Sequence, residues 1–195
     1  KLAVAECCRN LSVVGAEPVA ATNCLNFGNP ERPEIMAQLV EAIEGMADAC
    51  SFFGTPITGG NVSLYNETLG TPIYPTPVLG IVGLMKTTHP VTIDFKKPGD
   101  TIILLGGLGS TDETRFGSSQ YAKTILDQLW GLPPALDMEH EKKVQTATRE
   151  VVVGGLAESA HDLSEGGLAV ALARASLGAS KVGAAITLPS DLRRE

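Results

Sequence analysis

The chain has 195 residues, of which 44% are hydrophobic and 19% are charged. These fractions are typical of a globular protein with enough apolar material for a core, and they exclude a disordered chain. The formal net charge of −7 argues against a protein that binds nucleic acid or a membrane surface, because both are polyanions. No segment resembles a signal peptide and no apolar run is long enough to span a bilayer, so we expect a cytoplasmic protein.

The first part of the chain predicts alternating helices and strands. The predicted elements, in chain order, are a helix at residues 3–14, a strand at 18–25, a helix at 33–54, a strand at 56–65, and one or two strands at 71–85. In the long helix, Pro33 can occupy the first turn and Gly54 can end it. This order favours an α+β layer with helices on one face of a sheet.

The cysteines form no C-x-x-C pair and no other metal-binding spacing. Cys7 and Cys8 are neighbours on the first predicted helix, where their side chains point about 100° apart and do not easily share one tetrahedral ion. We therefore expect both of them, together with Cys24 and Cys50, to be reduced residues of a cytosolic core.

Residues 87–100, with two prolines and two lysines, mark the best domain boundary. We expect one domain over residues 1–90 and an α/β C-terminal domain, incomplete, over 91–195. The elements predicted for the second are a strand at 101–105, a glycine-rich turn at 106–110, helices at 121–130, 137–160 and 168–177, and a strand at 182–188. The turn matches neither phosphate-loop pattern, so we interpret it as a turn into a loop. The chain opens at Lys1 inside a helical pattern, which indicates a segment of a larger polypeptide.

Two of the predicted strands carry small or amide-bearing residues, Asn23 in the first and Gly59, Gly60 and Asn61 in the second. Because a helix separates these strands along the chain, they can lie together and form one site. Glycine lets a phosphate or ribose approach the main chain, and an asparagine oxygen can coordinate Mg²⁺. Ser63 follows Asn61 by two residues and so shares its strand face. The alternative is a β-bulge whose amides are satisfied by the asparagine.

The segment HDLSEGG, before the last predicted helix, is the second polar cluster. His161 and Asp162 are adjacent and face opposite ways on an extended chain, so we do not expect a dyad. Asp162 or Ser164 is more simply a helix N-cap, with the glycine pair allowing tight helix entry near an anion. His89 and His140 have no metal-ligand partner at a workable spacing. The residues alone indicate a ligand-binding α/β segment that handles phosphate and Mg²⁺.

Three motifs, taken in order, resemble one enzyme family. They are ATNCLNFGNPERPEI, TPITGGNVSLYNET and SAHDLSEGGLAVALA, and together they are similar to the second half of formylglycinamidine ribonucleotide synthetase. The first two are specific to that enzyme, whereas HDLSEGGL is shared more loosely with the aminoimidazole ribonucleotide synthetase superfamily. The resemblance implies an N-terminal domain of sheet plus helices, followed by an α/β C-terminal domain.

The resemblance also implies a reaction and partners. The family is an ATP-dependent ligase of purine biosynthesis that converts formylglycinamide ribonucleotide and ammonia to formylglycinamidine ribonucleotide, with ADP and phosphate as the other products. A glutaminase subunit supplies the ammonia, a small accessory subunit completes the complex, and Mg²⁺ accompanies ATP. The homologous first half of the family chain pairs its sheet with the second half.

Residue by residue, the resemblance assigns Asn23 and Gly60 to nucleotide binding, Asn61 to Mg²⁺ and Ser63 to the ribonucleotide substrate. The family usually has aspartate at the position of Asn23. An amide can hydrogen-bond a ribose or phosphate but brings no negative charge for a metal. The family's catalytic histidines belong to the first half, so we expect no catalytic residue in this segment and no activity of the segment alone.

Two other hypotheses remain open at this point. The first is another member of the superfamily, such as aminoimidazole ribonucleotide synthetase or selenophosphate synthetase, against which LNFGNP and NVSLYNE argue. The second is a non-catalytic scaffold half, which supplies sheet pairing and holds a structural nucleotide.

Overall fold

The computed structural model describes residues 1–86, 90–107, 115 and 117–188. The chain divides into two compact units that are discontinuous in sequence. Unit 1 comprises Lys1–Val91 and Gln145–Ala157, and unit 2 comprises Thr92–Val144 and Glu158–Glu195. We describe each unit by itself.

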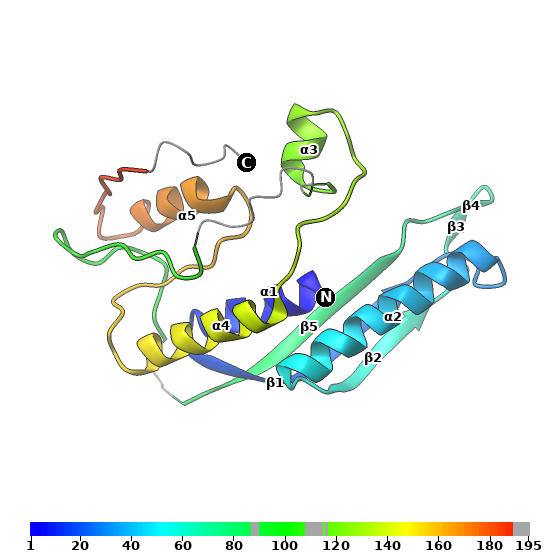
Figure 1. The fold of residues 1–195 in the computed structure, drawn as a ribbon, viewed down its shortest axis with the longest axis horizontal. Coiled ribbons are helices and arrows are strands. Elements are labelled where there is room, and N and C mark those ends of the chain that lie inside the picture. The colour runs from blue at the N-terminus through cyan, green and yellow to red at the C-terminus, as the bar shows by residue number, and fades with distance from the viewer. Residues whose placement is uncertain (87–89, 108–114, 116, 189–195) are drawn as a thin grey trace. The chain divides into compact units, whose positions relative to one another are not determined.

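Unit 1 contains a three-stranded sheet with the strand order β2-β1-β5 (Figure 1). Its elements are α1 (Leu2–Ser12), β1 (Ala16–Asn26), α2 (Pro33–Phe53), β2 (Ile57–Ser63) and β5 (Thr76–Met85). Strand β1 is parallel to β2 and antiparallel to β5, and α2 is the crossover between the two parallel strands. A short hairpin of β3 (Glu67–Thr68) and β4 (Thr71–Pro72) precedes β5. The predicted α+β layer is confirmed.

Both helices of the N-terminal region pack on one face of this sheet. The buried cluster under α2, with the side chains packed against it, consists of Leu25, Phe27, Ile35, Met46, Leu39, Ala42, Leu64 and Leu79. On β5, a Cβ at Gly83 would lie 2.8 Å from the side chain of Leu11 in α1. Leu79, which packs against the cluster under α2, and Gly83 are four residues apart on β5 and therefore face the same side of the sheet. Helices α1 and α2 thus cover the same face.

The opposite face of β5 is apolar and exposed. Val78, Val82 and Leu84 alternate with the covered residues, and each is more than half exposed, at 54%, 60% and 61%. A row of exposed β-branched and aliphatic side chains on one strand is typical of a surface that another sheet or chain covers.

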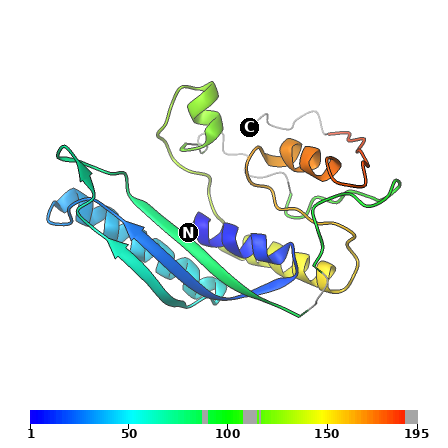
Figure 2. The same ribbon diagram turned by 180° about the vertical axis from the view of Figure 1, so that it is seen from behind.

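A helix from far along the chain completes unit 1. The second half of α4 (Met138–Val153) lies beside α1 in both views (Figures 1 and 2). Gln145, only 2% exposed, donates from Nε2 to the Ala5 carbonyl at 3.1 Å. The Arg149 guanidinium donates to Ser12 Oγ at 2.8 Å. These bonds join residues more than 130 positions apart in sequence.

The helices in the described part of unit 2 are α3 (Gln120–Ile125), the first half of α4, and α5 (Gly167–Ser176), and the residues between them are mostly irregular. The Phe95 amide donates to the Ala175 carbonyl at 3.0 Å. This bond joins the first residues of unit 2 to the end of α5. Lys97 pairs with Glu158 at 2.9 Å.

Two predicted strands of unit 2 are wrong. Residues 101–105 and 182–188 form no strand, and Ile103 is 72% exposed. An apolar run becomes a strand only where a neighbouring strand satisfies its backbone, and hydrophobic pattern alone does not show whether one is present. The helix predicted at 137–160 ends at Val153, because two glycines follow and Gly155 adopts φ +68°.

Candidate functional site

The two strands that carry the predicted site residues lie side by side. In the parallel pairing of β1 with β2, Asn23 lies opposite Gly60, Cys24 opposite Asn61, and Asn26 opposite Ser63. The predicted meeting of these two segments is therefore confirmed. The roles assigned to the residues stay predictions.

Asn23 and Gly60 form the pair on one face. A Cβ built at Gly60 would lie 2.1 Å from Asn23 Oδ1 and 2.7 Å from the Asn23 carbonyl oxygen. The Asn23 amide therefore occupies the volume that any larger residue at position 60 would need. Glycine is therefore needed at position 60 to make room for Asn23, and it would also permit the close approach of a ligand.

Asn61 and Ser63 lie on the other face of β2, as their spacing predicts. Asn61 is exposed, and its Nδ2 donates to Cys24 Sγ at 3.6 Å. With the amide nitrogen turned to the thiol, the amide oxygen is available to a cation or a ligand donor. The register places Gly60 with Asn23 on one face and Asn61 with Cys24 on the other, so the predicted nucleotide contacts and the predicted metal contact lie on opposite faces of the sheet.

The alternative interpretation as a β-bulge is correct in part. The pairing jumps from Ile57 opposite Ala21 to Gly59 opposite Thr22, so Thr58 is the extra residue. The Thr58 hydroxyl donates to the Ala21 carbonyl at 3.4 Å. Asn61, however, bonds the thiol opposite it rather than the bulge.

The chain segments that leave β1 and β2 remain bonded to each other beyond the sheet. The Phe27 amide donates to the Ser63 carbonyl at 3.0 Å, and the Tyr65 amide donates to the Gly28 carbonyl at 3.0 Å. A Cβ at Gly28 would lie 2.6 Å from Pro72 Cβ in β4, so the hairpin lies directly over this turn. LNFGNP and NVSLYNE are thus two halves of one interlocked structure, which the sequence did not reveal.

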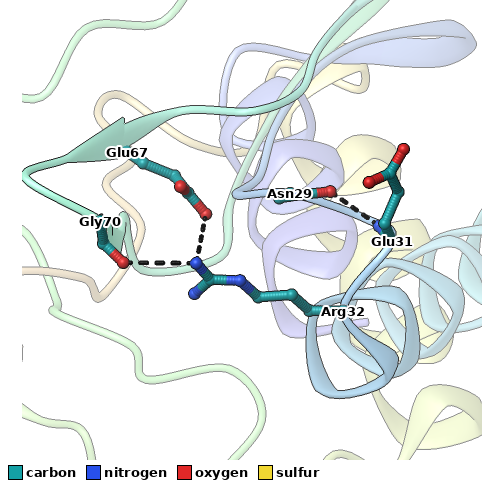
Figure 3. A network of polar contacts seen from close by, with 5 residues as sticks. All are labelled: Asn29, Glu31, Arg32, Glu67 and Gly70. Carbon is teal, nitrogen blue, oxygen red and sulfur yellow. Dashed lines mark hydrogen bonds and ion pairs between the residues drawn. The ribbon is translucent and has the colours of Figure 1, made fainter.

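An ion pair joins the hairpin to the start of α2 (Figure 3). Arg32 Nη2 lies 3.4 Å from Glu67 Oε1 and donates to the Gly70 carbonyl at 3.4 Å. Beside it, Asn29 Oδ1 accepts from the Glu31 amide at 2.8 Å. Glu67 Oε1 is buried, so the guanidinium stabilises a carboxylate oxygen that water does not reach.

The HDLSEGG segment of unit 2 differs from its prediction in two respects. His161 Nδ1 lies 3.3 Å from Asp162 Oδ1, and the two side chains are only 12% and 16% exposed, so the neighbours do contact each other. The N-cap of α5 is Gly166 at φ +74°, without a side-chain cap, so neither Asp162 nor Ser164 caps the helix. The helix begins instead after a glycine in the left-handed conformation, which a residue with a side chain rarely adopts.

The other candidates have ordinary structural roles. Gly106 and Gly107 adopt φ of +95° and +84°, as expected of a turn, while residues 108–110 lie outside the described part of the chain, as does His89. His140 Nε2 lies 3.0 Å from the Gly106 carbonyl. All four cysteines are reduced, and burial raises the pKa of the Cys7 thiol.

Charged metal ligands do not gather in the described part of the chain. No group of three or more His, Cys, Asp or Glu side chains there could hold a metal ion. Any Mg²⁺ at Asn61 would therefore take most of its ligands from phosphate oxygens and water, a common arrangement for this ion. Among the described helices, none is long and apolar enough to cross a membrane.

Two family models match consecutive parts of the chain. The model for AIR synthase related protein, N-terminal domain, matches residues 1–85, and that for AIR synthase related protein, C-terminal domain, matches residues 97–194. The chain belongs to the AIR synthase related family. The predicted fold class and the resemblance carried by the three motifs are thereby confirmed.

Within this family, the chain is similar to PurL, a phosphoribosylformylglycinamidine synthase subunit. It is 52% identical to PurL of Moorella thermoacetica over 195 residues, covering 98% of this chain and 26% of that protein. It is 49% identical to PurL of an Anaeromyxobacter species over 203 residues, covering 99% and 26%. The chain spans about a quarter of the length of these curated relatives.

The AIR synthase related fold also connects the chain to a more distant structure. The HypE–HypF complex contains a chain that superimposes on 90% of this one with a TM-score of 0.60. That chain is covered over 53% of its length, and the sequence identity is 22%. This likeness supports the fold alone.

Proposed function

We propose that this AIR synthase related chain is part of the second half of a phosphoribosylformylglycinamidine synthase. The complete enzyme would use ATP and ammonia from glutamine to convert formylglycinamide ribonucleotide to formylglycinamidine ribonucleotide, with ADP and phosphate as products. The observation that carries this proposal is the 52% identity to a PurL subunit across 98% of the chain. Identity at this level over both domains favours the synthase over other members of the superfamily.

In this proposal, the ends of β1 and β2 bind Mg-nucleotide and substrate. Asn23 and the main chain at Gly60 contact the nucleotide, Asn61 Oδ1 contacts Mg²⁺, and the Ser63 hydroxyl contacts the ribonucleotide. The two strands pair in parallel, and β2 is the edge strand of this sheet. A ligand at that edge would therefore reach the main chain of Gly60 together with Asn61 and Ser63, while the Asn23 side chain lies beside Gly60 on the opposite face.

The donor chemistry fits a metal that arrives with a nucleotide. Asn61 offers one neutral amide oxygen, and its amide nitrogen is already bonded to Cys24. Mg²⁺ dehydrates reluctantly and is commonly held by substrate phosphates, waters and one or two protein oxygens. When bound, the ion would neutralise phosphate charge and orient the nucleotide, while Asn61 would fix its position.

The domain organisation and the partners follow from the same proposal. Residues 1–90 and 91–195 are the N- and C-terminal domains, with the helix around Gln145 packed on the first. The exposed row of Val78, Val82 and Leu84 is the surface that the homologous first half covers. That half supplies the catalytic histidines, and glutaminase and small accessory subunits complete a cytoplasmic enzyme. This segment alone is inactive.

The substitution Asn61→Ala in the full-length enzyme tests the metal assignment. Loss of the amide oxygen removes one Mg²⁺ contact, so we expect the KM for Mg-ATP to rise, or kcat to fall, by about ten-fold. The matched control is Asn10→Ala, at an exposed position of α1, which should leave both constants unchanged.

Kinetics of Asn61→Ala equal to those of the control would refute the metal assignment. Weaker equilibrium binding of the nucleotide with both the KM for Mg-ATP and kcat unchanged would instead support the scaffold alternative, in which the nucleotide is structural. Steady-state kinetics and equilibrium nucleotide binding, measured on the same preparations, separate these results.

A further inference from the structure

Asn66 lies three residues beyond Ser63, where the chain turns away from β2, and its side chain turns back toward the strand end. Nδ2 donates to the Ser63 carbonyl at 2.9 Å and to the Phe27 carbonyl at 3.0 Å. The main-chain amide of Asn66 also donates to the Phe27 carbonyl, at 3.2 Å. One residue therefore holds together the segments that leave β1 and β2.

The same side chain contacts the Ser63 hydroxyl. Ser63 Oγ lies 3.3 Å from Asn66 Oδ1 and 3.1 Å from Asn66 Nδ2. A primary amide has two hydrogens, and both are used by the carbonyls of Ser63 and Phe27. The consistent assignment is that the Ser63 hydroxyl donates to Asn66 Oδ1, with its lone pairs left for another donor.

We propose that Asn66 is a positioning residue for the reaction, which holds the Ser63 hydroxyl in one rotamer and one proton orientation for the ribonucleotide. This inference rests on the proposed contact between Ser63 and the substrate. A free serine hydroxyl samples three rotamers, and fixing one before the substrate binds lowers the entropic cost of binding. The bonds of the partly buried Asn66 amide to Ser63 and Phe27 fix the hydroxyl before any substrate binds.

The position also explains why the two motifs are interlocked. Asn66 binds the Phe27 carbonyl, which belongs to LNFGNP, and Ser63, which belongs to NVSLYNE. A shift of either segment would therefore move the hydroxyl. The substrate contact on β2 depends in this way on the loop that follows β1.

The test is a double-mutant cycle in the full-length enzyme with Ser63→Ala, Asn66→Ala and the double variant. Asn66→Ala should raise the KM for formylglycinamide ribonucleotide by about ten-fold and leave the KM for Mg-ATP within about two-fold. In the Ser63→Ala background, Asn66→Ala should cause no further rise, because its effect passes through the hydroxyl.

A conservative variant separates positioning from stability. Asn66→Asp keeps an oxygen that can accept from Ser63 but loses both donors to the carbonyls. It should therefore unfold at a lower temperature than the unmodified enzyme and still have a lower KM for the ribonucleotide than Asn66→Ala. If Asn66→Ala does not fold, Asn66→Ser takes its place in the cycle, because its short side chain does not reach Ser63 and Phe27 together.

The outcomes distinguish the inference from the proposed function. If Ser63→Ala leaves the KM for the ribonucleotide unchanged, the substrate assignment fails and the inference fails with it. If Ser63→Ala raises that KM but Asn66→Ala does not, or if the two effects are additive, only the positioning role of Asn66 is refuted. Asn10→Ala is again the matched control.

Discussion

At the scale of single residues, the central feature is the contact between Asn23 and Gly60. The asparagine amide fills the space next to the glycine Cα, so the two positions depend on each other. At Gly59, one residue earlier, an added Cβ would meet no atom of the described residues within 4 Å. Of the two adjacent glycines, Gly59 has room for a side chain and Gly60 has none.

Gly60→Ala should disturb the nucleotide site, whereas Gly59→Ala should not. The new methyl group would displace the Asn23 side chain and strain the main chain, at a cost of about 1–3 kcal/mol in stability. We expect Gly60→Ala to lower the melting temperature and raise the KM for Mg-ATP. Equal behaviour of the two variants in thermal unfolding and kinetics would contradict this expectation.

The sequence predicted part of this site. Asn61 and Ser63 were expected on a common face because they are two residues apart and side chains alternate along any strand. The register between β1 and β2 depends on the bulge at Thr58, which no local pattern revealed. For that reason the partners across the strands, Asn23 for Gly60 and Cys24 for Asn61, could not be predicted.

At the scale of elements, prediction was accurate where a segment carries its own terminators. The long helix was expected at residues 33–54 and forms α2 (Pro33–Phe53), with Gly54 in the left-handed conformation at its end. Proline at the start and glycine at the end act locally, so one sequence shows both. The strand expected at 101–105 failed because pairing is a property of two segments.

The packing of α4 on α1 is an element-scale feature with a testable consequence. Gln145 is buried and bonded to the Ala5 carbonyl, so Gln145→Ala loses that bond and leaves a cavity. We expect a stability loss of about 1–3 kcal/mol, seen as a lower melting temperature of the full-length enzyme. Gln38→Ala, at an exposed position of α2, is the matched control.

An unchanged melting temperature for Gln145→Ala would mean that the bond from Gln145 to the Ala5 carbonyl contributes nothing to the stability of unit 1. The bond from Arg149 to Ser12 would then remain as a side-chain link between this helix and α1. No sequence pattern indicated this association, because a helix of mixed polarity does not show which surface it covers.

At the scale of the whole molecule, the chain is a quarter-length match to its PurL relatives, with an apolar sheet face left exposed on β5. The exposed face supports the proposal that further polypeptide covers this sheet. The resemblance carried by LNFGNP and NVSLYNE predicted the family. The residues alone reached only a phosphate- and Mg²⁺-binding α/β segment.

The most direct test of the proposed function is ADP formation by the full-length enzyme with ammonium chloride as the nitrogen source. We expect ADP production that requires both formylglycinamide ribonucleotide and ammonia, with one formylglycinamidine ribonucleotide formed per ADP. The isolated 195-residue chain should show no turnover in the same assay. ATP consumption that requires formylglycinamidine ribonucleotide as substrate, or turnover by the isolated chain, would contradict the proposed function.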